Sequence, residues 1–269
     1  MLQYAARRYF NRAERINMLS YILIFVSVAL SIFSNIQEKF VTWVFLLQVA
    51  ITIIIFFLQN IIHKFTDIGA SCRHLFDYKL FGFNPTTKYG NYTEDEIYEL
   101  AVGEKHKNKK KYDIAISHKG TDKERGVKFW YKLDSSWPIN KAIMECQKQN
   151  VFWDKKLTAV VCGAILIVNI VTISLLVIIN LNSTLLEIII NIFGPMFLLV
   201  EKDALFVQKC FALYKLHAKM NTCFNADEST PEARQELIEE RRRLDFIVPN
   251  FLHHLFSDTL HAQVNDLVS

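Results

Sequence analysis

Four long apolar stretches constrain this chain more than any other feature of its sequence. Residues 18–36, 41–62 and 157–181 contain no charged side chain, and residues 185–200 contain one, Glu187. An α-helix rises about 1.5 Å per residue and the hydrocarbon core of a bilayer is about 30 Å thick, so about 20 residues cross it. The first three stretches are long enough to cross a membrane, and the fourth is at the short limit.

A signal peptide and a soluble core both fit these stretches less well than membrane spans do. A cleaved signal peptide has a shorter apolar core followed by a small-residue cleavage site, and residues 18–36 are longer and lack such a site. Runs such as residues 51–58 have no polar face, so in a soluble protein they would have to be fully buried. Four such segments in 269 residues leave too little protein to cover them. The sequence therefore predicts a mainly α-helical membrane protein.

Short connections between the apolar stretches predict two transmembrane helical hairpins. Residues 37–40 join the first pair and residues 182–184 join the second pair, so the N-terminus, region 63–156 and the C-terminus share one side of the membrane. Of the 31 Lys and Arg residues, only Lys39 lies in a hairpin connection. Because positive charge close to helix ends favours the cytoplasmic side, we expect both termini and region 63–156 in the cytoplasm.

These boundaries divide the chain into five segments. They are a cytoplasmic amphipathic arm (1–17), the first transmembrane hairpin (18–62), a mostly helical cytoplasmic domain (63–156), the second transmembrane hairpin (157–200) and a cytoplasmic helical tail (201–269). The arm has apolar residues at helical spacing opposite its arginines, namely Leu2, Ala6, Tyr9, Ala13 and Ile16. This face suits an anionic membrane surface, and the alternative is that the arm only sets the topology.

Local signals predict further helices outside the membrane. Residues 63–80 continue the second span, and residues 138–153 lead into the third. Thr93 with Glu96 is the pattern of a capping box, which opens a helix through about residue 102. In the tail, Thr230 is an expected N-cap with Pro231 at the first helical position, and Pro249 interrupts the pattern. The basic run 105–111 is expected to be a mobile loop, and the weak alternation of residues 112–117 favours a short strand.

The sequence contains none of the common catalytic or metal-binding signatures. Five cysteines without a C-x-x-C pair form neither a disulfide framework nor a zinc site, and His253 and His254 point to different faces of a helix. Asp77, Asp154 and the acidic run 94–96 are better explained by helix caps and salt bridges than by acid–base chemistry. We therefore expect no enzyme activity, catalytic residue, metal or cofactor.

Polar side chains within the apolar stretches mark a possible pore or contacts between helices. Gln48, Asn169, Asn180, Glu187 and Asn191 lie within or at the ends of the stretches, and the candidates are Gln48, Asn169, Glu187 and Asn191. Glu187 and Asn191 are four residues apart and share one helix face. Ionisable groups inside a membrane usually face the bundle interior or a water-filled path, whereas amides often join helices through hydrogen bonds.

Region 63–156 is basic and carries aromatic residues among its lysines. It has 18 Lys and Arg against 13 Asp and Glu, and residues 128–132 read Lys-Phe-Trp-Tyr-Lys. Aromatic rings stack on bases and cations pair with phosphates, so this pattern suits a nucleotide ligand. The alternative is a packed Trp-Tyr pair flanked by solvated lysines.

The same region resembles a known family. Residues 126–131 (GVKFWY) and 143–157 (IMECQKQNVFWDKKL) resemble the W-Y and C-Q-x-x-N-x-x-W-D-x-x-L block of the SMODS-associated four-transmembrane effector family. Residues 76–82, 234–241 and 248–250 resemble flanking segments of that family, in the same order. The chain departs from the pattern at Lys148 and Thr158, where the family pattern leads us to expect arginine. The resemblance therefore carries no phosphate contact over to these two positions.

The resemblance implies an effector of cyclic-oligonucleotide-based anti-phage signalling (CBASS) in the bacterial inner membrane. A nucleotidyltransferase would make a cyclic di- or trinucleotide, which the cytoplasmic domain would bind as the activating ligand. The effector would then permeabilise the membrane as a homo-oligomer, with lipids as partners and no binding of DNA or RNA. The expected ligand-binding residues, for which domain packing is the alternative role, are Lys128, Trp130, Tyr131, Gln147, Asn150 and Trp153. Alternative functions are a small channel or transporter without nucleotide gating, a membrane-anchored scaffold, or a membrane-bound enzyme.

Overall fold

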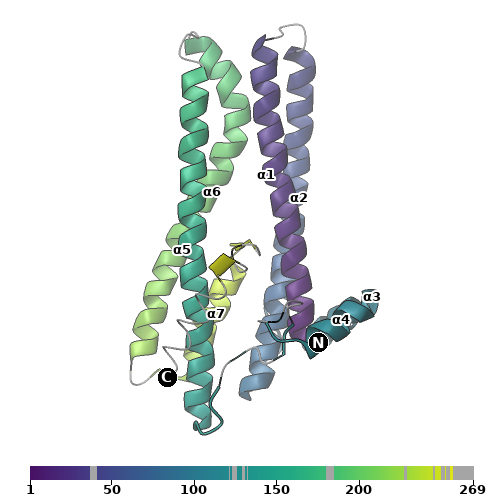
Figure 1. Cartoon of the computed structure of the whole chain (residues 1–269), viewed down its shortest axis with the longest axis vertical. Coiled ribbons are helices and arrows are strands. Elements are labelled where there is room, and N and C mark those ends of the chain that lie inside the picture. Colours follow the sequence, from purple (N-terminus) through teal and green to yellow (C-terminus); the bar gives the residue numbers. More distant parts are fainter. Residues whose placement is uncertain are drawn as a thin grey trace. The chain divides into compact units, whose positions relative to one another are not determined.

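The structure is a computed structural model that describes residues 1–36, 41–120, 122, 126–128, 131, 133–179, 185–226, 229–244, 246–249, 252 and 255–256. Within these residues the chain forms seven α-helices (Figure 1): α1 (Leu2–Ile36), α2 (Val41–Phe81), α3 (Glu94–Lys107), α4 (Lys109–Ser117), α5 (Ile139–Ile179), α6 (Leu185–Asn225) and α7 (Pro231–Arg243). The β-structure in this described part consists of two isolated bridges, Tyr89 with Tyr92 and Lys119 with Lys128. The prediction of a mainly helical fold is confirmed.

The chain divides into two compact units. The first, which we name the polar unit, comprises Met1–Glu14, His63–Leu157 and Ala212–Ser269. The second, which we name the apolar unit, comprises Arg15–Ile62 and Thr158–Phe211. Helices α1, α2, α5 and α6 each contribute one part to each unit without interruption. Continuous helical backbone therefore connects the two units four times.

Three described helices are long and apolar enough to cross a membrane. The corresponding segments are Leu2–Leu30, Thr42–Phe81 and Ile139–Thr172. Large hydrophobic side chains cover the outside of the apolar unit: Phe56 and Ile167, for example, are 65% and 64% exposed. A soluble protein rarely exposes so much contiguous apolar surface, and contact with lipid removes it from water. Residues 185–200 are helical within α6, but their side chains lie outside the described part, so a fourth span stays a prediction.

The amphipathic arm is the first part of α1, and its apolar face packs against protein. Leu2, Ala6, Tyr9 and Ala13 are at most 8% exposed, and the first three belong to a cluster with residues of α2 and α3. The helices approach closely at Gly69, where a Cβ atom would lie 3.0 Å from the Phe10 ring. This face is therefore not available to lie on a membrane surface, which was one of the two expectations for it.

A buried carboxylate fastens α3 to α1. Glu104 is 1% exposed and accepts two hydrogen bonds from Arg12, at 2.8 and 2.6 Å, and one from Lys107 at 3.1 Å. Burial opposes ionisation of Glu104, but the hydrogen bonds and charges of Arg12 and Lys107 outweigh it and hold its pKa below the usual value. The negative charge of Glu104 on α3 is thus neutralised by Arg12 on α1, and both helices also pack into the same hydrophobic cluster.

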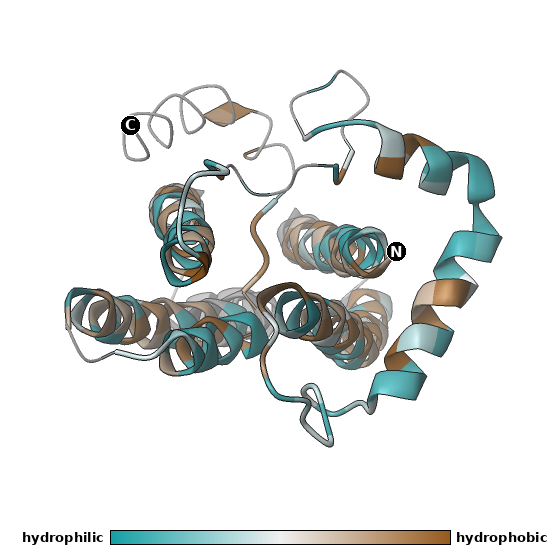
Figure 2. Cartoon of the chain, turned by 90° about the horizontal axis from the view of Figure 1, so that it is seen from below, coloured by the Kyte–Doolittle hydropathy of each residue, from teal (hydrophilic) through white to brown (hydrophobic). Residues whose placement is uncertain are grey.

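Two expectations for residues 105–117 are wrong. The basic run continues α3 to Lys107 and then begins α4, with Asn108 as the break between them. Its side-chain oxygen accepts a hydrogen bond from the Lys111 backbone N–H at 3.0 Å and caps α4, which replaces the predicted strand. Cations in the last turn of α3 also suit the negative end of the helix dipole. Both helices are mostly hydrophilic with short hydrophobic bands (Figure 2). The alternation of apolar and polar residues over 112–117 was therefore too short to distinguish a helix from a strand.

The other local predictions are confirmed. Thr93 and Glu96 form the capping box of α3, and the Thr93 backbone N–H donates to the Glu96 carboxylate at 2.8 Å. Thr230 caps α7, with Pro231 as its first residue. Residues 63–80 continue α2, and residues 139–153 begin α5.

Replacing Glu104 by glutamine should loosen the start of α1. The change leaves Arg12 without its carboxylate, which for a largely buried ion pair costs about 3 kcal/mol. Cys72 belongs to the same cluster, is 0% exposed, and burial raises its pKa to about 12, so it should react with maleimide only when the cluster opens. We expect its labelling rate, measured by peptide mass spectrometry, to rise about 100-fold. Exposed Glu99 on the same helix gives the control Glu99→Gln, and equal rates in both variants would contradict the prediction.

Candidate functional site

A buried network of polar side chains in the polar unit is centred on Asp77 of α2. Asp77 is 0% exposed. The hydroxyl of Tyr131 donates to Asp77 Oδ1 at 3.0 Å, and Asn150 Nδ2 of α5 donates to the same hydroxyl at 2.8 Å. These bonds connect α2 to α5 through the segment that precedes α5. A buried carboxylate requires such partners because an unpaired charge in an apolar interior is strongly unfavourable.

Helix α7 supplies the remaining partners of Asp77. Gln235 Nε2 donates to Asp77 Oδ2 at 3.2 Å, and an Arg242 nitrogen lies 2.7 Å from the same oxygen. Arg242 also donates to Glu239 Oε1 at 2.6 Å, and Gln235 donates to that oxygen at 2.6 Å. Arg242 therefore lies between two carboxylates, and α7 is joined to α2 by charge-assisted hydrogen bonds, which are stronger than neutral ones.

Gln147 of α5 holds the beginning of α7. Its side chain is 0% exposed, and its Nε2 donates to the Pro231 carbonyl at 2.8 Å and to Gln235 Oε1 at 3.3 Å. Its Oε1 accepts a hydrogen bond from Arg234 Nε at 3.0 Å. Both ends of the amide are thus used by the first turns of α7. We call the set Asp77, Tyr131, Gln147, Asn150, Arg234, Gln235, Glu239 and Arg242 the Asp77 network.

A second carboxylate, Asp154 of α5, connects α5 to α6 and α7. Its Oδ2 accepts a hydrogen bond from Arg241 Nε at 2.6 Å and lies 2.9 Å from His217 Nε2. Burial raises the pKa of Asp154, but Arg241 and His217 outweigh this effect and lower the pKa below its usual value. The apolar contacts of Leu216, Met220 and Ile238 lie in the same bundle of helices. Asp154 therefore stays ionised and binds α5, α6 and α7 together.

Burial shifts the titration of two further groups around Arg242. It raises the pKa of Glu239 to about 7, with Arg242 opposing the shift and Asp77 adding to it. It lowers the pKa of His74 to about 4, assisted by the positive charges of Arg242 and Arg243. His74 Nδ1 lies 4.0 Å from Glu239 Oε2. A neutral histidine beside a carboxyl that titrates close to neutrality makes this end of the network sensitive to pH.

Comparison with known families identifies the chain. The model of the SMODS-associating 4TM effector domain matches residues 1–268. The chain belongs to this family of SMODS-associating 4TM effectors. It is accordingly a membrane effector of CBASS-like defence, associated with a nucleotidyltransferase of the SMODS type, and effector domains of this membrane type are not typically catalytic. Searches of curated proteins and of solved structures give no match.

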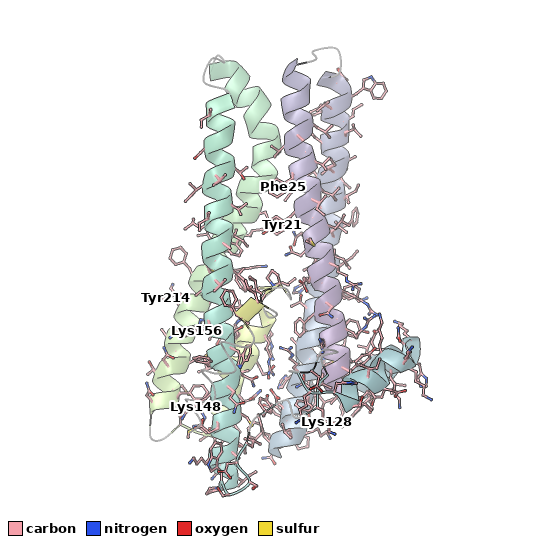
Figure 3. The ribbon with its side chains drawn as sticks, in the orientation of Figure 1. Tyr21, Phe25, Lys128, Lys148, Lys156 and Tyr214 are labelled. Atoms are coloured by element: carbon pink, nitrogen blue, oxygen red, sulfur yellow. The ribbon has the colours of Figure 1, made fainter. Side chains whose placement is uncertain are left out.

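Three of the six residues expected to contact a ligand in this SMODS-associating 4TM effector belong to the Asp77 network. Tyr131, Gln147 and Asn150 make the hydrogen bonds given above to protein partners, which supports the alternative role in domain packing. Trp153 is half-buried on α5, and Lys128 is exposed before α5 (Figure 3). Trp130 lies outside the described residues. Ligand binding by these six residues stays a prediction.

The polar residues of the apolar unit are only partly described. Gln48 Nε2 donates to the Ser27 carbonyl at 3.2 Å, so it connects α2 to α1. Asn169 lies in α5, and Glu187 and Asn191 lie in α6, but their side chains are outside the described part. A pore lined by these residues therefore stays a prediction.

The two positions at which the chain departs from the family pattern have different surroundings. Lys148 forms an ion pair with Glu145 of the same helix at 2.9 Å and is 45% exposed. Thr158 is 5% exposed, and its hydroxyl has no hydrogen-bond partner among the described residues. The described residues also contain no group of three His, Cys, Asp or Glu side chains placed to hold a metal ion.

Several residues of the Asp77 network and of the Asp154 contacts are not expected from the sequence. The sequence favours caps or salt bridges for Asp77 and Asp154, and the ion pairs confirm the second of these roles. Arg242, Gln235 and His217 carry no signal of their own. Arg234, Gln235 and Arg241 fall within a segment that resembles the family, so the resemblance is the one indication that this helix matters.

Replacing Tyr131 by phenylalanine should weaken the network without disrupting the fold. The variant loses one hydrogen bond to Asp77 and one from Asn150, at a cost of about 1–3 kcal/mol. Cys146 packs in the same cluster as Tyr131, is 2% exposed, and its pKa is raised to about 12 by burial. We expect its maleimide labelling to accelerate about tenfold. Tyr214, which is 75% exposed (Figure 3), provides the control Tyr214→Phe; a Tyr131 variant that labels at the control rate would show that the bonds do not stabilise the cluster.

Glu239 should make the polar unit less stable as the pH rises from about 4.5 to about 7. The unfolded chain releases the Glu239 proton near pH 4.5, whereas the folded chain retains it to about pH 7, so unfolding becomes easier across this interval and changes no further above it. His74 acts with the opposite sign between about pH 6.5 and 4, because its folded pKa is lowered. Glu239→Gln keeps an acceptor for Gln235 and removes the first contribution only.

The measurement is the thermal midpoint of the detergent-solubilised protein at pH 5, 6, 7 and 8. The midpoint of Glu239→Gln relative to the original chain should increase between pH 5 and 7 and then stay constant. A constant difference over the whole series would contradict the raised pKa.

Proposed function

We propose that this protein is a cyclic-nucleotide-activated effector that permeabilises the bacterial inner membrane and so ends a phage infection. The observation that carries the proposal is the continuity of α2, α5 and α6. Each of these helices contributes side chains to the Asp77 network or to the Asp154 contacts and then continues into the apolar unit. A helix is a stiff rod, so a rearrangement of its polar end is transmitted to its apolar part.

The proposed mechanism is a shift between two populations. A ligand changes the balance of two states only by binding one more tightly, and moving a 1:99 mixture to 99:1 requires about 10⁴-fold tighter binding to the active state. The buried polar network suits such a two-state element because hydrogen-bonded charges exchange partners in discrete steps. Arg242, placed between Asp77 and Glu239, has such a choice of partners, and Gln235 contacts the same two carboxylates.

The charge distribution supports a polar unit in the cytoplasm. The polar unit contains Arg7, Arg8 and Arg12 of the arm, and of the 31 Lys and Arg residues only Lys39 lies in a predicted hairpin connection. The positive-inside rule then favours a polar unit, with both termini, on the side where a cytoplasmic messenger reaches it.

The scaffold alternative loses its main support. A scaffold could dock a partner through the charged residues 239–243 at the end of α7, but Glu239 and Arg241 are 4% and 8% exposed and are bonded within the polar unit. Arg242 is likewise committed to Asp77. Two charges of this run, Glu240 and Arg243, remain exposed.

The proposal is tested by dye release from liposomes that contain the purified protein. We expect release on addition of one member of a panel of cyclic di- and trinucleotides, and none without nucleotide. Release without any nucleotide would indicate an ungated channel, and no release under any condition would favour a scaffold or an enzyme.

Trp130→Ala locates the expected sensor in the same assay. It should abolish the response, whereas Trp137→Ala, in the same segment before α5, serves as the matched control. Binding should be measured separately by equilibrium dialysis of the nucleotide. If the Trp130→Ala variant binds the nucleotide normally and its liposomes release dye normally, the aromatic–basic segment 128–132 is not the sensor.

A further inference from the structure

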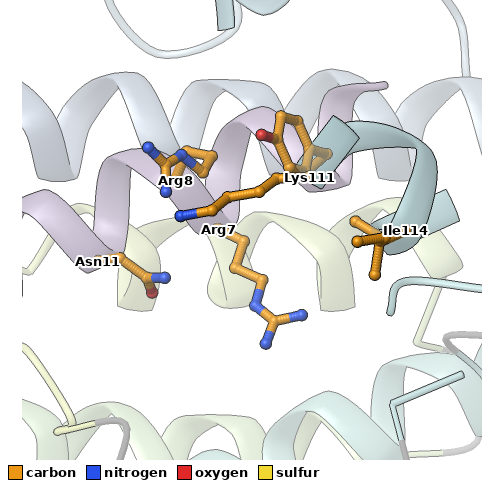
Figure 4. A pocket seen from close by; sticks show the side chains of 7 residues that line it. Arg7, Arg8, Asn11, Lys111 and Ile114 are labelled. Atoms are coloured by element: carbon orange, nitrogen blue, oxygen red, sulfur yellow. The ribbon is translucent and has the colours of Figure 1, made fainter. Parts of the chain in front are cut away.

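A basic pocket lies within the polar unit, between the first turns of α1 and the short helix α4. Its volume is about 330 Å³. The lining residues are Tyr4, Arg7, Arg8, Asn11, Lys111, Ile114 and Ala115. In Figure 4 the Lys111 side chain extends from α4 toward Arg8 of α1. None of these residues belongs to the Asp77 network or to the aromatic–basic segment that suggested nucleotide binding.

The pocket gathers more positive than negative charge. Arg7, Arg8 and Lys111 line it, and no Asp or Glu is among its lining residues. The Glu104 carboxylate lies 3.9 Å from Arg8 Nε, but it already accepts hydrogen bonds from Arg12 and Lys107. Arg8 is therefore the third cation around one carboxylate, and its buried Nε has no hydrogen-bond partner among the described residues.

A buried hydroxyl in the lining has no partner either. Tyr4 is 3% exposed, and its Oη makes no hydrogen bond within the described part of the chain. The ring is held edge-to-face against Tyr112 of α4, with the ring centroids 5.3 Å apart. An unsatisfied buried hydroxyl costs free energy, and buried polar groups in native proteins nearly always have a partner. A hydroxyl held in this way beside three cations is suited to an anionic oxygen.

We propose that this pocket binds a phosphate group of a phosphate-bearing ligand. Arg guanidinium groups match phosphate oxygens in two-bond geometry, Lys111 adds a point charge, and Tyr4 and Asn11 add neutral donors. The volume is at the lower end of ligand pockets, which suits one phosphate with its attached sugar or glycerol better than a whole cyclic nucleotide. The ligand would contact both α1 and α4 and hold them together. It would so act on α1, which continues into the apolar unit.

Two sources of phosphate share this chemistry, a soluble nucleotide and a lipid headgroup. Tyr4 and Asn11 precede the apolar stretch at Met18 by 14 and 7 residues, or about 21 and 10 Å along a helix. The headgroup layer is about 5–8 Å thick on each side of the hydrocarbon core, so most of the pocket lies beyond it. This position favours the nucleotide, an assignment that rests on the proposed function.

The experiment measures binding to the full chain in detergent with three probes. They are inorganic phosphate, the panel of cyclic di- and trinucleotides, and phosphatidylglycerol against phosphatidylcholine added as mixed lipid–detergent micelles. Lys111→Gln should raise the half-saturating phosphate concentration about tenfold, the loss expected for one charge-assisted hydrogen bond. Lys110→Gln removes a neighbouring exposed lysine of α4 that does not line the pocket, and it should leave this concentration unchanged. Equal behaviour of the two variants would overturn the proposal.

The probes also separate this proposal from the proposed function. A nucleotide response that depends on Lys111 supports both, and phosphatidylglycerol binding that depends on Lys111 without any nucleotide response supports the pocket with a lipid ligand and contradicts the proposed function. Nucleotide-triggered release that is unchanged by Lys111→Gln retains the function and rejects the pocket as its sensor.

Tyr4→Phe distinguishes a ligand contact from a structural role. Because the hydroxyl has no described partner, its removal should leave the thermal midpoint without ligand unchanged or slightly higher, while phosphate affinity falls. A lower midpoint together with unchanged phosphate affinity would show that the hydroxyl serves the fold instead.

Discussion

The packing of the polar unit depends on the hydrogen bonds and the ion pair that stabilise the buried carboxylate of Asp77. Removing a carboxylate from water costs several kcal/mol, and this cost is met only by well-placed partners. Here the partners come from the segment before α5, through Tyr131, and from α7, through Gln235 and Arg242. An alteration in any of these elements leaves a buried charge incompletely paired. The carboxylate therefore makes the packing of α2, α5 and α7 interdependent.

This interdependence joins parts of the chain that are far apart in the sequence. Asp77 lies in α2, whereas Gln235 lies in α7 and is 158 residues away. The bond between them is thus one of the contacts that folding must close over a long loop, at an entropic cost that grows slowly with loop length. Asp154 of α5 makes a similar connection to His217 of α6 and Arg241 of α7. Each of these contacts involves a helix that also continues into the apolar unit.

The sequence predicted features set by neighbours along the chain and missed those set by neighbours in space. Apolar length, the Thr93–Glu96 box and the Thr230 cap are local properties, and the structure confirms them. The helical state of residues 112–117 depends on the Asn108 cap and on packing against α1, which a short alternating pattern does not encode. Composition and resemblance point to Tyr131, Gln147 and Asn150, but their partners on α2 and α7 needed the tertiary structure.

The carboxylates of the polar unit are distributed unevenly, and this has a consequence for α1. Asp77, Glu104 and Glu239 are all at most 4% exposed and are engaged with arginines, whereas the pocket beside α4 has cations without an acidic lining residue. An anion that entered this pocket would relieve repulsion between Arg8 and Lys111, and it would also compete with Glu104 for Arg8. Both effects change how α1 is held by α3 and α4. Since α1 continues into the apolar unit, an anion bound at its first turns would act on a helix that also belongs to that unit.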